Sequence, residues 1–203
     1  MILQITELSK SFYQSSVFNK FSLRVESGER VGLTGPNGSG KTTLLKMISG
    51  IMSFDSGEID VGEQKVHSEN LDSRKNLYYI GHSIGLYPGL TGRENLDFIA
   101  KLYEKSSSKN SDILTKVGLI SSKMKNVKFY SHGMRQRLKL ASALLIDPDL
   151  LLLDEPVTGL DSDGIKLFEN IMLDWTHQEK TIMIVSHDLD WLSSQTDRIV
   201  ELD

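Results

Sequence analysis

The chain has 203 residues, no cysteine, a formal net charge of −4 at pH 7 and a sequence pI near 5.8. Its length allows one domain, or one domain with a subdomain, to bury a full hydrophobic core, and its acidic balance supplies no global basic field for nucleic-acid binding. The absence of cysteine excludes disulfides, thiolate zinc sites and thiol catalysis, and it fits a reducing compartment.

The N-terminal segment 1–5 lacks the basic and long apolar regions of a signal peptide. No stretch of the sequence approaches the run of apolar residues that a membrane-spanning helix needs. We therefore expect any role at a membrane to be peripheral.

The first part of the chain alternates short apolar runs with turn residues. This pattern predicts a small antiparallel sheet that packs onto the strand preceding a glycine-rich loop. The expected strands are 2–5, 21–25, 30–34, 56–61 and 77–80.

The segment Gly35–Thr43 matches the pattern G-x-x-x-x-G-K-[ST] and lies between the expected strand 30–34 and a helix-like run at 44–48. In this context the glycines let successive N–H groups turn toward phosphate oxygens, and the helix adds its positive N-terminal end. Lys41 is expected to reach the β- and γ-phosphates, and Thr42 to hold Mg²⁺. The residues that we assign to the phosphates are Asn37, Gly38, Ser39, Gly40, Lys41, Thr42 and Thr43.

The pattern changes to a helical one between about residues 87 and 147. Thr91 and Glu94 form a capping-box signature, and apolar residues follow them at helical spacing. The polar segment 105–111 predicts a connection between helices, and 112–128 favours helix over strand.

Four leucines at 150–153 lead directly into Asp154 and Glu155. The run is too short to cross a bilayer but fits a strand of a parallel sheet that is buried on both faces and delivers two carboxylates beside the phosphates. Asp154 is expected to support Mg²⁺, directly or through water, and Glu155 to polarise the attacking water. Two further strands are expected at 181–185 and 198–200.

The predicted fold is therefore α/β, with a parallel core of the P-loop NTPase type, an antiparallel β-subdomain and an inserted α-helical subdomain. We expect one domain over 1–203. Residues 1–86 and 148–203 would form the nucleotide-binding core with its β-subdomain, and 87–147 the helical subdomain.

Residues 130–137, Tyr-Ser-His-Gly-Met-Arg-Gln-Arg, resemble the signature L-S-G-G-Q-x-Q-R of ATP-binding cassette (ABC) ATPases. The resemblance extends over the whole chain. It places Phe12 or Tyr13, with Val17, at the adenine. It places His82 at the Q-loop, where this residue would contact Mg²⁺ or the lytic water, and Asp161 in the D-loop. It identifies His187 as the switch histidine, which would touch the γ-phosphate and brace Glu155.

The resemblance implies the ATPase subunit of an ABC transporter, with ATP and Mg²⁺ as cofactors. In that family two cassettes pack head to tail, so the hydroxyl of Ser131 and the N–H of Gly133 would serve the nucleotide of a second copy, with a homodimer expected. It further implies a separate membrane-spanning subunit and a location on the cytoplasmic face of the cell membrane. Leu86, Tyr87 and Pro88 would offer an apolar groove to a helix of that subunit, although ordinary packing explains them equally well.

Two positions depart from the family pattern. His82 stands where most members have Gln, and the pair Gly81-His82 is similar to the ATPase subunit of the cytochrome c maturation, or haem exporter, transporter, whose small size also matches. His132 and Met134 replace Gly and Gln of the signature. Because Ser131 and Gly133, the groups that would contact phosphate, are retained, we expect nucleotide binding to be kept and the rate of hydrolysis to change.

Two other functions are open. One is a soluble ABC ATPase that acts on nucleic acid or ribosomes, although such relatives usually carry coiled coils, zinc cysteines or two cassettes, and we expect no nucleic-acid partner. The other is a regulatory module that senses ATP without hydrolysis, which the intact catalytic set disfavours: Lys41, Thr42, Asp154, Glu155 and His187.

Overall fold

The computed structural model describes residues 2–13, 15–66, 75–81 and 85–203. The chain divides into two compact units. The first comprises Met1–Gly81, Asp149–Glu155 and Trp175–Asp203, and the second comprises His82–Pro148 and Pro156–Asp174. Among the described residues, no helix combines the length and apolar character needed to span a membrane.

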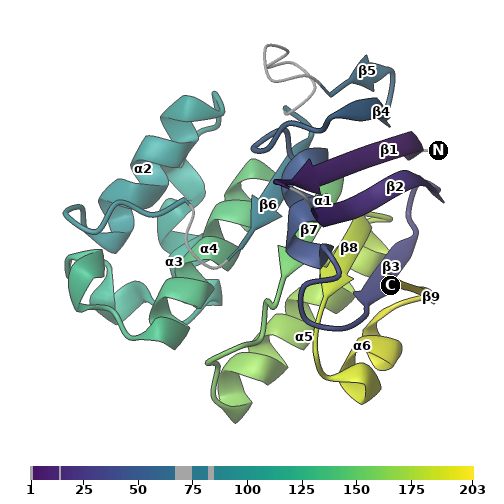
Figure 1. The fold of residues 1–203 in the computed structure, drawn as a ribbon. Coiled ribbons are helices and arrows are strands. Elements are labelled where there is room, and N and C mark those ends of the chain that lie inside the picture. The colour runs from purple at the N-terminus through teal and green to yellow at the C-terminus, as the bar shows by residue number, and fades with distance from the viewer. Residues whose placement is uncertain (1, 14, 67–74, 82–84) are drawn as a thin grey trace. The chain divides into compact units, whose positions relative to one another are not determined.

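The first unit contains one antiparallel and one parallel sheet (Figure 1). The antiparallel sheet has the order β2-β1-β4-β5, with β1 at Leu3–Phe12, β2 at Ser15–Val25, β4 at Ser56–Val61 and β5 at Gln64–Lys65. The parallel sheet has the order β6-β7-β8-β3-β9, with β3 at Arg30–Thr34, β6 at Leu77–Ile80, β7 at Leu150–Asp154, β8 at Thr181–Val185 and β9 at Arg198–Glu201.

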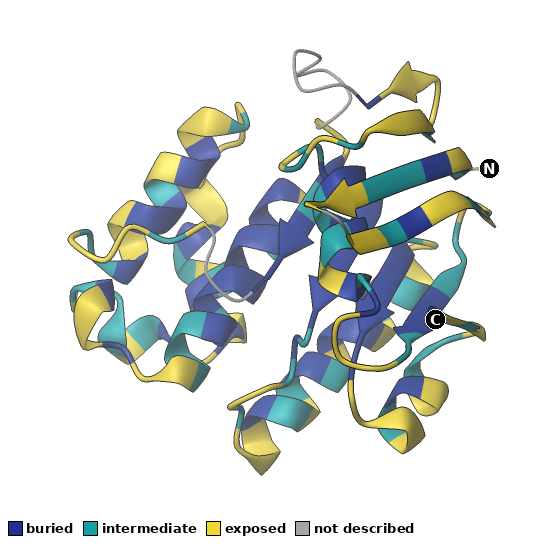
Figure 2. Ribbon diagram, in the orientation of Figure 1, coloured by how far each residue is buried: buried dark blue, intermediate teal, exposed yellow. Residues whose placement is uncertain are grey.

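The core of the first unit lies around the central parallel strands. Every residue of β7 and β8 is buried, as the dark blue of these two strands shows in Figure 2. Continuous apolar runs are what a parallel strand covered on both faces requires. One apolar cluster joins residues of both sheets with the buried face of α1, Lys41–Ile48, so the helix that follows the glycine-rich loop is anchored in this core.

The predicted strands are present. The first strand, however, runs on to Phe12 instead of ending near residue 5, and the short strand β5 was not predicted. The pairing of β1 with β2 shifts register between Ile5 and Leu8 and again before Ser11, and Glu7 has a φ of 48°. Such bulges break the apolar–polar alternation by which a strand is recognised, so the far half of β1 is not visible in the pattern.

The second unit is helical. It contains α2 at Gly92–Leu102, α3 at Asn110–Lys116, α4 at His132–Ile146 and short 3₁₀ turns at Ser107–Lys109, Ile120–Ser122 and Val127–Phe129. The predicted capping box is confirmed, because the Thr91 hydroxyl accepts from the Glu94 N–H at 3.2 Å and the Glu94 carboxylate accepts from the Thr91 N–H at 2.8 Å. Helix α5, Ser162–His177, has residues in both units, and α6, Leu189–Gln195, belongs to the first.

The segment 105–111, predicted to connect helices, lies between α2 and α3 and includes a 3₁₀ turn and the first residues of α3. Residues 112–128, where helix was favoured over strand, contain the rest of α3, which ends at Lys116, one 3₁₀ turn and the start of another. Gly118 ends the helix with a φ of 70°. The N–H of Leu119 bonds to the carbonyl of Leu114 at 2.7 Å and the N–H of Gly118 to that of Thr115 at 3.0 Å, which is the Schellman arrangement that terminates helices.

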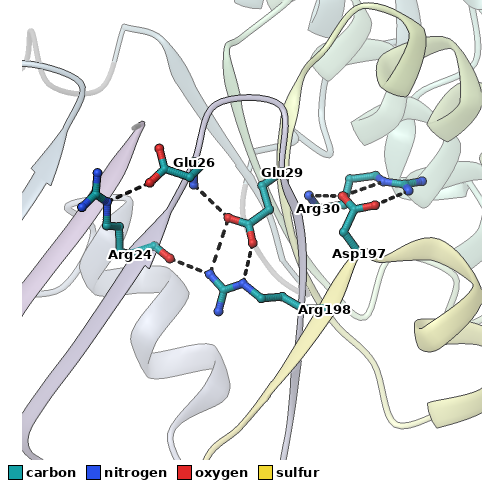
Figure 3. Close-up of polar contacts among 6 residues, drawn as sticks. All are labelled: Arg24, Glu26, Glu29, Arg30, Asp197 and Arg198. Carbon is teal, nitrogen blue, oxygen red and sulfur yellow. Dashed lines mark hydrogen bonds and ion pairs between the residues drawn. The ribbon is translucent and has the colours of Figure 1, made fainter.

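Charged side chains connect the turn before β3 with the start of β9 (Figure 3). Arg30 pairs with Asp197 at 2.6 Å, and Arg198 pairs with Glu29. The Arg198 guanidinium also donates to the backbone carbonyl of Arg24 at 2.5 Å. These contacts attach the last strand of the chain to its neighbour β3.

Candidate functional site

The predicted catalytic residues of the first unit lie at one edge of the parallel sheet. The glycine-rich loop follows β3, the acidic pair closes β7, and His187 follows β8. All neighbouring pairs among these strands are parallel, so their carboxyl ends meet at the same edge. In open α/β folds this edge is where ligands bind.

The glycine-rich loop has a backbone that depends on its glycines. Gly38 and Gly40 have φ angles of 91° and 94°, in the left-handed region that glycine adopts without strain. A Cβ added to Gly40 would lie 2.5 Å from Cγ1 of Val17 and 2.8 Å from the ring of Phe18, whereas one added to Gly38 would meet nothing within 4 Å. The loop is therefore packed onto β2 at one point and open at the other, and Val17 lies against the loop.

Lys41 is buried inside the curl of this loop. Its ammonium group donates to the carbonyl oxygens of Gly35 and Pro36 at 2.7 and 2.8 Å. Ser39 is buried as well, while Asn37, Gly38 and Thr42 are exposed and Thr43 is half-buried. The assigned phosphate contacts thus form one continuous turn, with the positive charge of Lys41 at its centre.

Thr42 and Asp154 meet at 3.1 Å, where the Thr42 hydroxyl donates to Oδ1 of the carboxylate. A hydroxyl and a carboxylate oxygen are hard donors of the kind that Mg²⁺ takes together with phosphate oxygens and water. No group of three or more His, Asp or Glu side chains converges as a metal site within the residues that the structure describes. The donors present therefore fit a Mg²⁺ ion that shares its coordination with a nucleotide.

Glu155 and His187 also lie together, with Nε2 of His187 3.2 Å from Oε1 of Glu155. The Glu155 side chain is 12% exposed and that of His187 62% exposed, so the carboxylate is enclosed and the imidazole reaches solvent. Glu155 has a φ of 53°, and its N–H still donates to the carbonyl of Val185 at 3.0 Å. A carboxylate in such a position, beside a solvent-exposed imidazole, has the chemistry of a general base.

The aromatic residues proposed for adenine lie at the end of β1. Phe12 is 40% exposed and Tyr13, with a φ of 54°, is fully exposed. The Lys10 ammonium lies 5.2 Å from the centre of the Phe12 ring. Either ring is available to stack on a base, so the structure leaves both candidates in place.

The signature residues belong to the second unit, at the start of α4. The Ser131 hydroxyl accepts from the N–H of Met134 at 3.2 Å, and Ser131 is thereby the N-cap of α4. Asp161 accepts from the Gly164 N–H at 2.8 Å and from the Arg137 guanidinium at 2.7 Å. The first of these hydrogen bonds, together with Arg137, lowers the pKa of Asp161.

His132, which replaces a glycine of the family signature, has a specific contact in the structure. The His132 Nε2 lies 3.1 Å from the carbonyl oxygen of Thr158. A Cβ added to Gly159 would lie 2.2 Å from the His132 ring, so this glycine leaves the space that the ring occupies. Only the fold pairs these segments, and no local pattern could have indicated it.

Two further predictions concern the region after β6. His82 lies outside the described residues. Tyr87 is half exposed, its ring is 4.7 Å from that of Phe98 between centres, and its N–H donates to the side chain of Asn95 at 2.7 Å. The groove predicted at Leu86, Tyr87 and Pro88 stays a prediction.

A family model described as "ABC transporter" matches residues 18–158. Over 201 residues the chain is 37% identical to an uncharacterized ABC transporter ATP-binding protein, YdbJ, of Bacillus subtilis (strain 168). This match covers 98% of the present chain and 65% of YdbJ. Over 206 residues it is 31% identical to the linearmycin resistance ATP-binding protein LnrL of the same organism, covering 100% of this chain and 66% of that protein.

Solved structures agree with these relatives. An ATP-binding subunit of an ABC transporter superposes with a TM-score of 0.91 at 28% identity, over 100% of this chain and 86% of that chain. A dimeric ATP-binding cassette, MJ0796, solved in a post-hydrolysis state with ADP and Pi, superposes with a TM-score of 0.89 at 23% identity. The match covers 100% of this chain and 94% of that chain, and it shows that the two share a fold.

This chain belongs to the ABC transporter family, and it has the fold and motif set of an ABC ATPase domain. The resemblance seen in its motifs and the predicted fold class are therefore confirmed. The chain spans about two thirds of the length of the first two relatives, 65% and 66%.

Proposed function

We propose that this chain binds and hydrolyses ATP as the nucleotide-binding subunit of an ABC transporter. It would act on the cytoplasmic face of the cell membrane, as a head-to-tail homodimer that drives a separate membrane-spanning subunit. Family membership supports the class of the reaction, and the sheet-edge geometry supports the roles of individual residues.

Each residue at the edge would have one task in hydrolysis. Lys41 would place its positive charge on the β- and γ-phosphate oxygens, where negative charge is concentrated in the transition state. Glu155 would hold the attacking water and accept its proton, and His187 would keep Glu155 oriented while reaching the γ-phosphate. Thr42 and Asp154 would hold Mg²⁺, which neutralises phosphate charge when bound.

The observation that carries this proposal is the 3.2 Å contact between Glu155 and His187 at the edge that also holds the phosphate loop. A module that only senses ATP has no need for an enclosed carboxylate braced by a histidine. This arrangement favours hydrolysis over the sensing function.

ATP binding by the purified chain tests the assignment of the phosphate loop. Replacing Lys41 by Ala removes a buried ammonium group from the centre of the loop, and charge-assisted hydrogen bonds of this kind are worth about 10- to 100-fold in affinity. Calorimetric titration with ATP should therefore show a loss of that size. Lys46→Ala, at the other end of the same helix, removes the same charge and should bind ATP as the parent does. Equal affinities of all three proteins would contradict the assignment.

The signature residues support a dimer. Ser131 and Gly133 stand at the first turn of α4, whose N–H groups and positive end suit a phosphate. In the proposed dimer they would complete the site of the second copy. The dimeric state of the solved cassette MJ0796 is consistent with this arrangement.

The cargo is decided by the membrane subunit. The Gly81-His82 pair gave the prediction of a haem or cytochrome c biogenesis exporter, which stays a prediction because His82 is outside the described residues. The name of one relative, the linearmycin resistance protein, suggests export of an antibiotic instead. Identification of the membrane protein that co-purifies with this chain would decide between these cargo classes.

A further inference from the structure

Tyr79 of β6 lies on Asp154, the carboxylate proposed to support the metal. Its hydroxyl donates to Oδ2 of Asp154 at 2.9 Å, while the Thr42 hydroxyl donates to Oδ1 at 3.1 Å. Asp154 is 3% exposed and Tyr79 8% exposed. Both oxygens of a buried carboxylate are therefore held by hydroxyl groups, one from each side.

The strand register explains how the tyrosine reaches this carboxylate. β6 pairs with β7 in parallel, with Tyr79 opposite Leu152. Side chains two residues apart on a strand share a face, so Tyr79 is the diagonal neighbour of Asp154 across the pair. Tyr78, opposite Leu151, lies on the other face of the sheet.

Gly81, just after β6, makes room for the phenol ring. A Cβ added to Gly81 would lie 2.2 Å from the Tyr79 hydroxyl oxygen and 2.4 Å from the ring carbon that bears it. The tyrosine thus fills the space that a side chain at position 81 would occupy, and a larger residue there would displace its hydroxyl from Asp154.

We propose that Tyr79 is a positioning residue for the metal and nucleotide site, whose hydroxyl holds one oxygen of Asp154 so that the other faces Thr42 and the phosphate loop. This inference rests on the proposed function, since it assumes that Asp154 supports Mg²⁺ beside ATP. Hydrogen-bonded partners of metal-supporting carboxylates commonly contribute 10- to 100-fold to metal affinity. The ring of Tyr79 belongs to the apolar core, so only the hydroxyl is assigned this role.

Metal binding, measured without turnover, tests the proposal. Mn²⁺ replaces Mg²⁺, and electron paramagnetic resonance measures its affinity for the chain saturated with a non-hydrolysable ATP analogue. Tyr79→Phe keeps the ring and removes the hydroxyl, and it should bind Mn²⁺ about tenfold more weakly or worse. Tyr78→Phe removes a hydroxyl from the same strand on the opposite face and should match the parent.

A double-mutant cycle separates positioning from a structural effect. If the hydroxyl acts through the carboxylate, Tyr79→Phe should change the Mn²⁺ affinity of an Asp154→Asn protein much less than that of the parent. An equal loss in both backgrounds, or no loss in the parent, would overturn the positioning role while leaving the metal site intact. Unchanged Mn²⁺ affinity in Asp154→Asn alone would overturn the metal site itself, and the role of Tyr79 with it.

Discussion

Glu155 combines a special backbone with a special side-chain position. A non-glycine residue in the left-handed region costs about 1–3 kcal/mol and persists only where surrounding contacts impose it. Here the N–H of Glu155 remains bonded to Val185 of β8, so the chain turns sharply after β7 without leaving the sheet. The turn aims the carboxylate toward His187, which follows β8. The backbone conformation is thus a means of directing this side chain.

Glu155→Gln is predicted to bind ATP with nearly parental affinity and to hydrolyse it about 10²- to 10⁴-fold more slowly, because an amide cannot accept the proton of water. ATP would then persist in a closed dimer, which light scattering can detect. Glu179→Gln is a matched control, since Glu179 is an exposed glutamate with a similar φ of 55°. Hydrolysis at the parental rate in Glu155→Gln would show that another group is the base.

The motif residues could be predicted from the sequence because phosphate binding needs glycines, a lysine and a hydroxyl at fixed spacing on one continuous turn. Tyr79 could not, because a tyrosine in a β-rich run looks like any core residue. Its hydroxyl reaches Asp154, 75 residues further along the chain, only through the pairing of β6 with β7. The contact of His132 with the carbonyl of Thr158 likewise depends on tertiary structure.

At the scale of elements, the most regular segments were the most predictable. The leucine run 150–153 is a strand covered on both faces, as its length and apolar character predict, and Thr91 with Glu94 defines the start of α2. Within 112–128, where helix was favoured over strand, the extent of the helix was not predictable: α3 ends at Lys116, before the left-handed backbone of Gly118. From the sequence pattern alone, a glycine that lies within a helix cannot be distinguished from a glycine that ends it.

The attachment of β9 is predicted to weaken in acid. The hydrogen bonds of the Arg30 side chain lower the pKa of Asp197, and those of the Arg198 side chain lower the pKa of Glu29. Since both folded-state pKa values lie below the unfolded ones, near 4, their stabilisation is complete above the unfolded values and is lost as the pH falls through the folded values.

Urea unfolding at pH 7 and pH 3 measures this contribution. Asp197→Asn should lower the free energy of unfolding at pH 7 by about 1 kcal/mol or less, because the pair with Arg30 is partly exposed to solvent. The difference from the parent should narrow at pH 3, where the parental carboxylate is becoming protonated. Glu63→Gln, in the exposed turn between β4 and β5, controls for the loss of one surface charge. A constant difference between the two pH values would contradict the prediction.

At the scale of the whole molecule, the motifs are divided between the two compact units. The phosphate loop, the acidic pair and His187 belong to the first, whereas Ser131, Gly133 and Asp161 belong to the second. The change from strand-like to helical patterning could indicate a helical insertion. That its signature serves a second copy came only from the resemblance to ABC ATPases, because periodicity carries no information about a partner chain.

Mixing two inactive variants tests the proposed head-to-tail dimer. Lys41→Ala disables the phosphate loop of its own chain, and Gly133→Asp places a carboxylate at the first turn of α4, where it would repel the phosphate of the second copy. Each nucleotide site of a head-to-tail dimer combines the phosphate loop of one copy with the signature of the other. In a heterodimer of these variants, one site therefore carries both substitutions and the other site carries neither. Random pairing of equal amounts makes about half of the dimers mixed, so about a quarter of the parental ATPase activity should return.

The controls follow from the same geometry. Gly133→Asp alone should bind ATP as the parent does, because its own phosphate loop is unchanged. A Cβ at Gly133 would lie 3.1 Å from the carbonyl oxygen of Gly159, so thermal unfolding must first show that the variant folds. Mixing Lys41→Ala with a chain that carries both substitutions leaves no intact site and should restore nothing. If the first mixture also restores nothing although heterodimers form, the signature does not act on the nucleotide of the second copy, and the head-to-tail dimer is wrong.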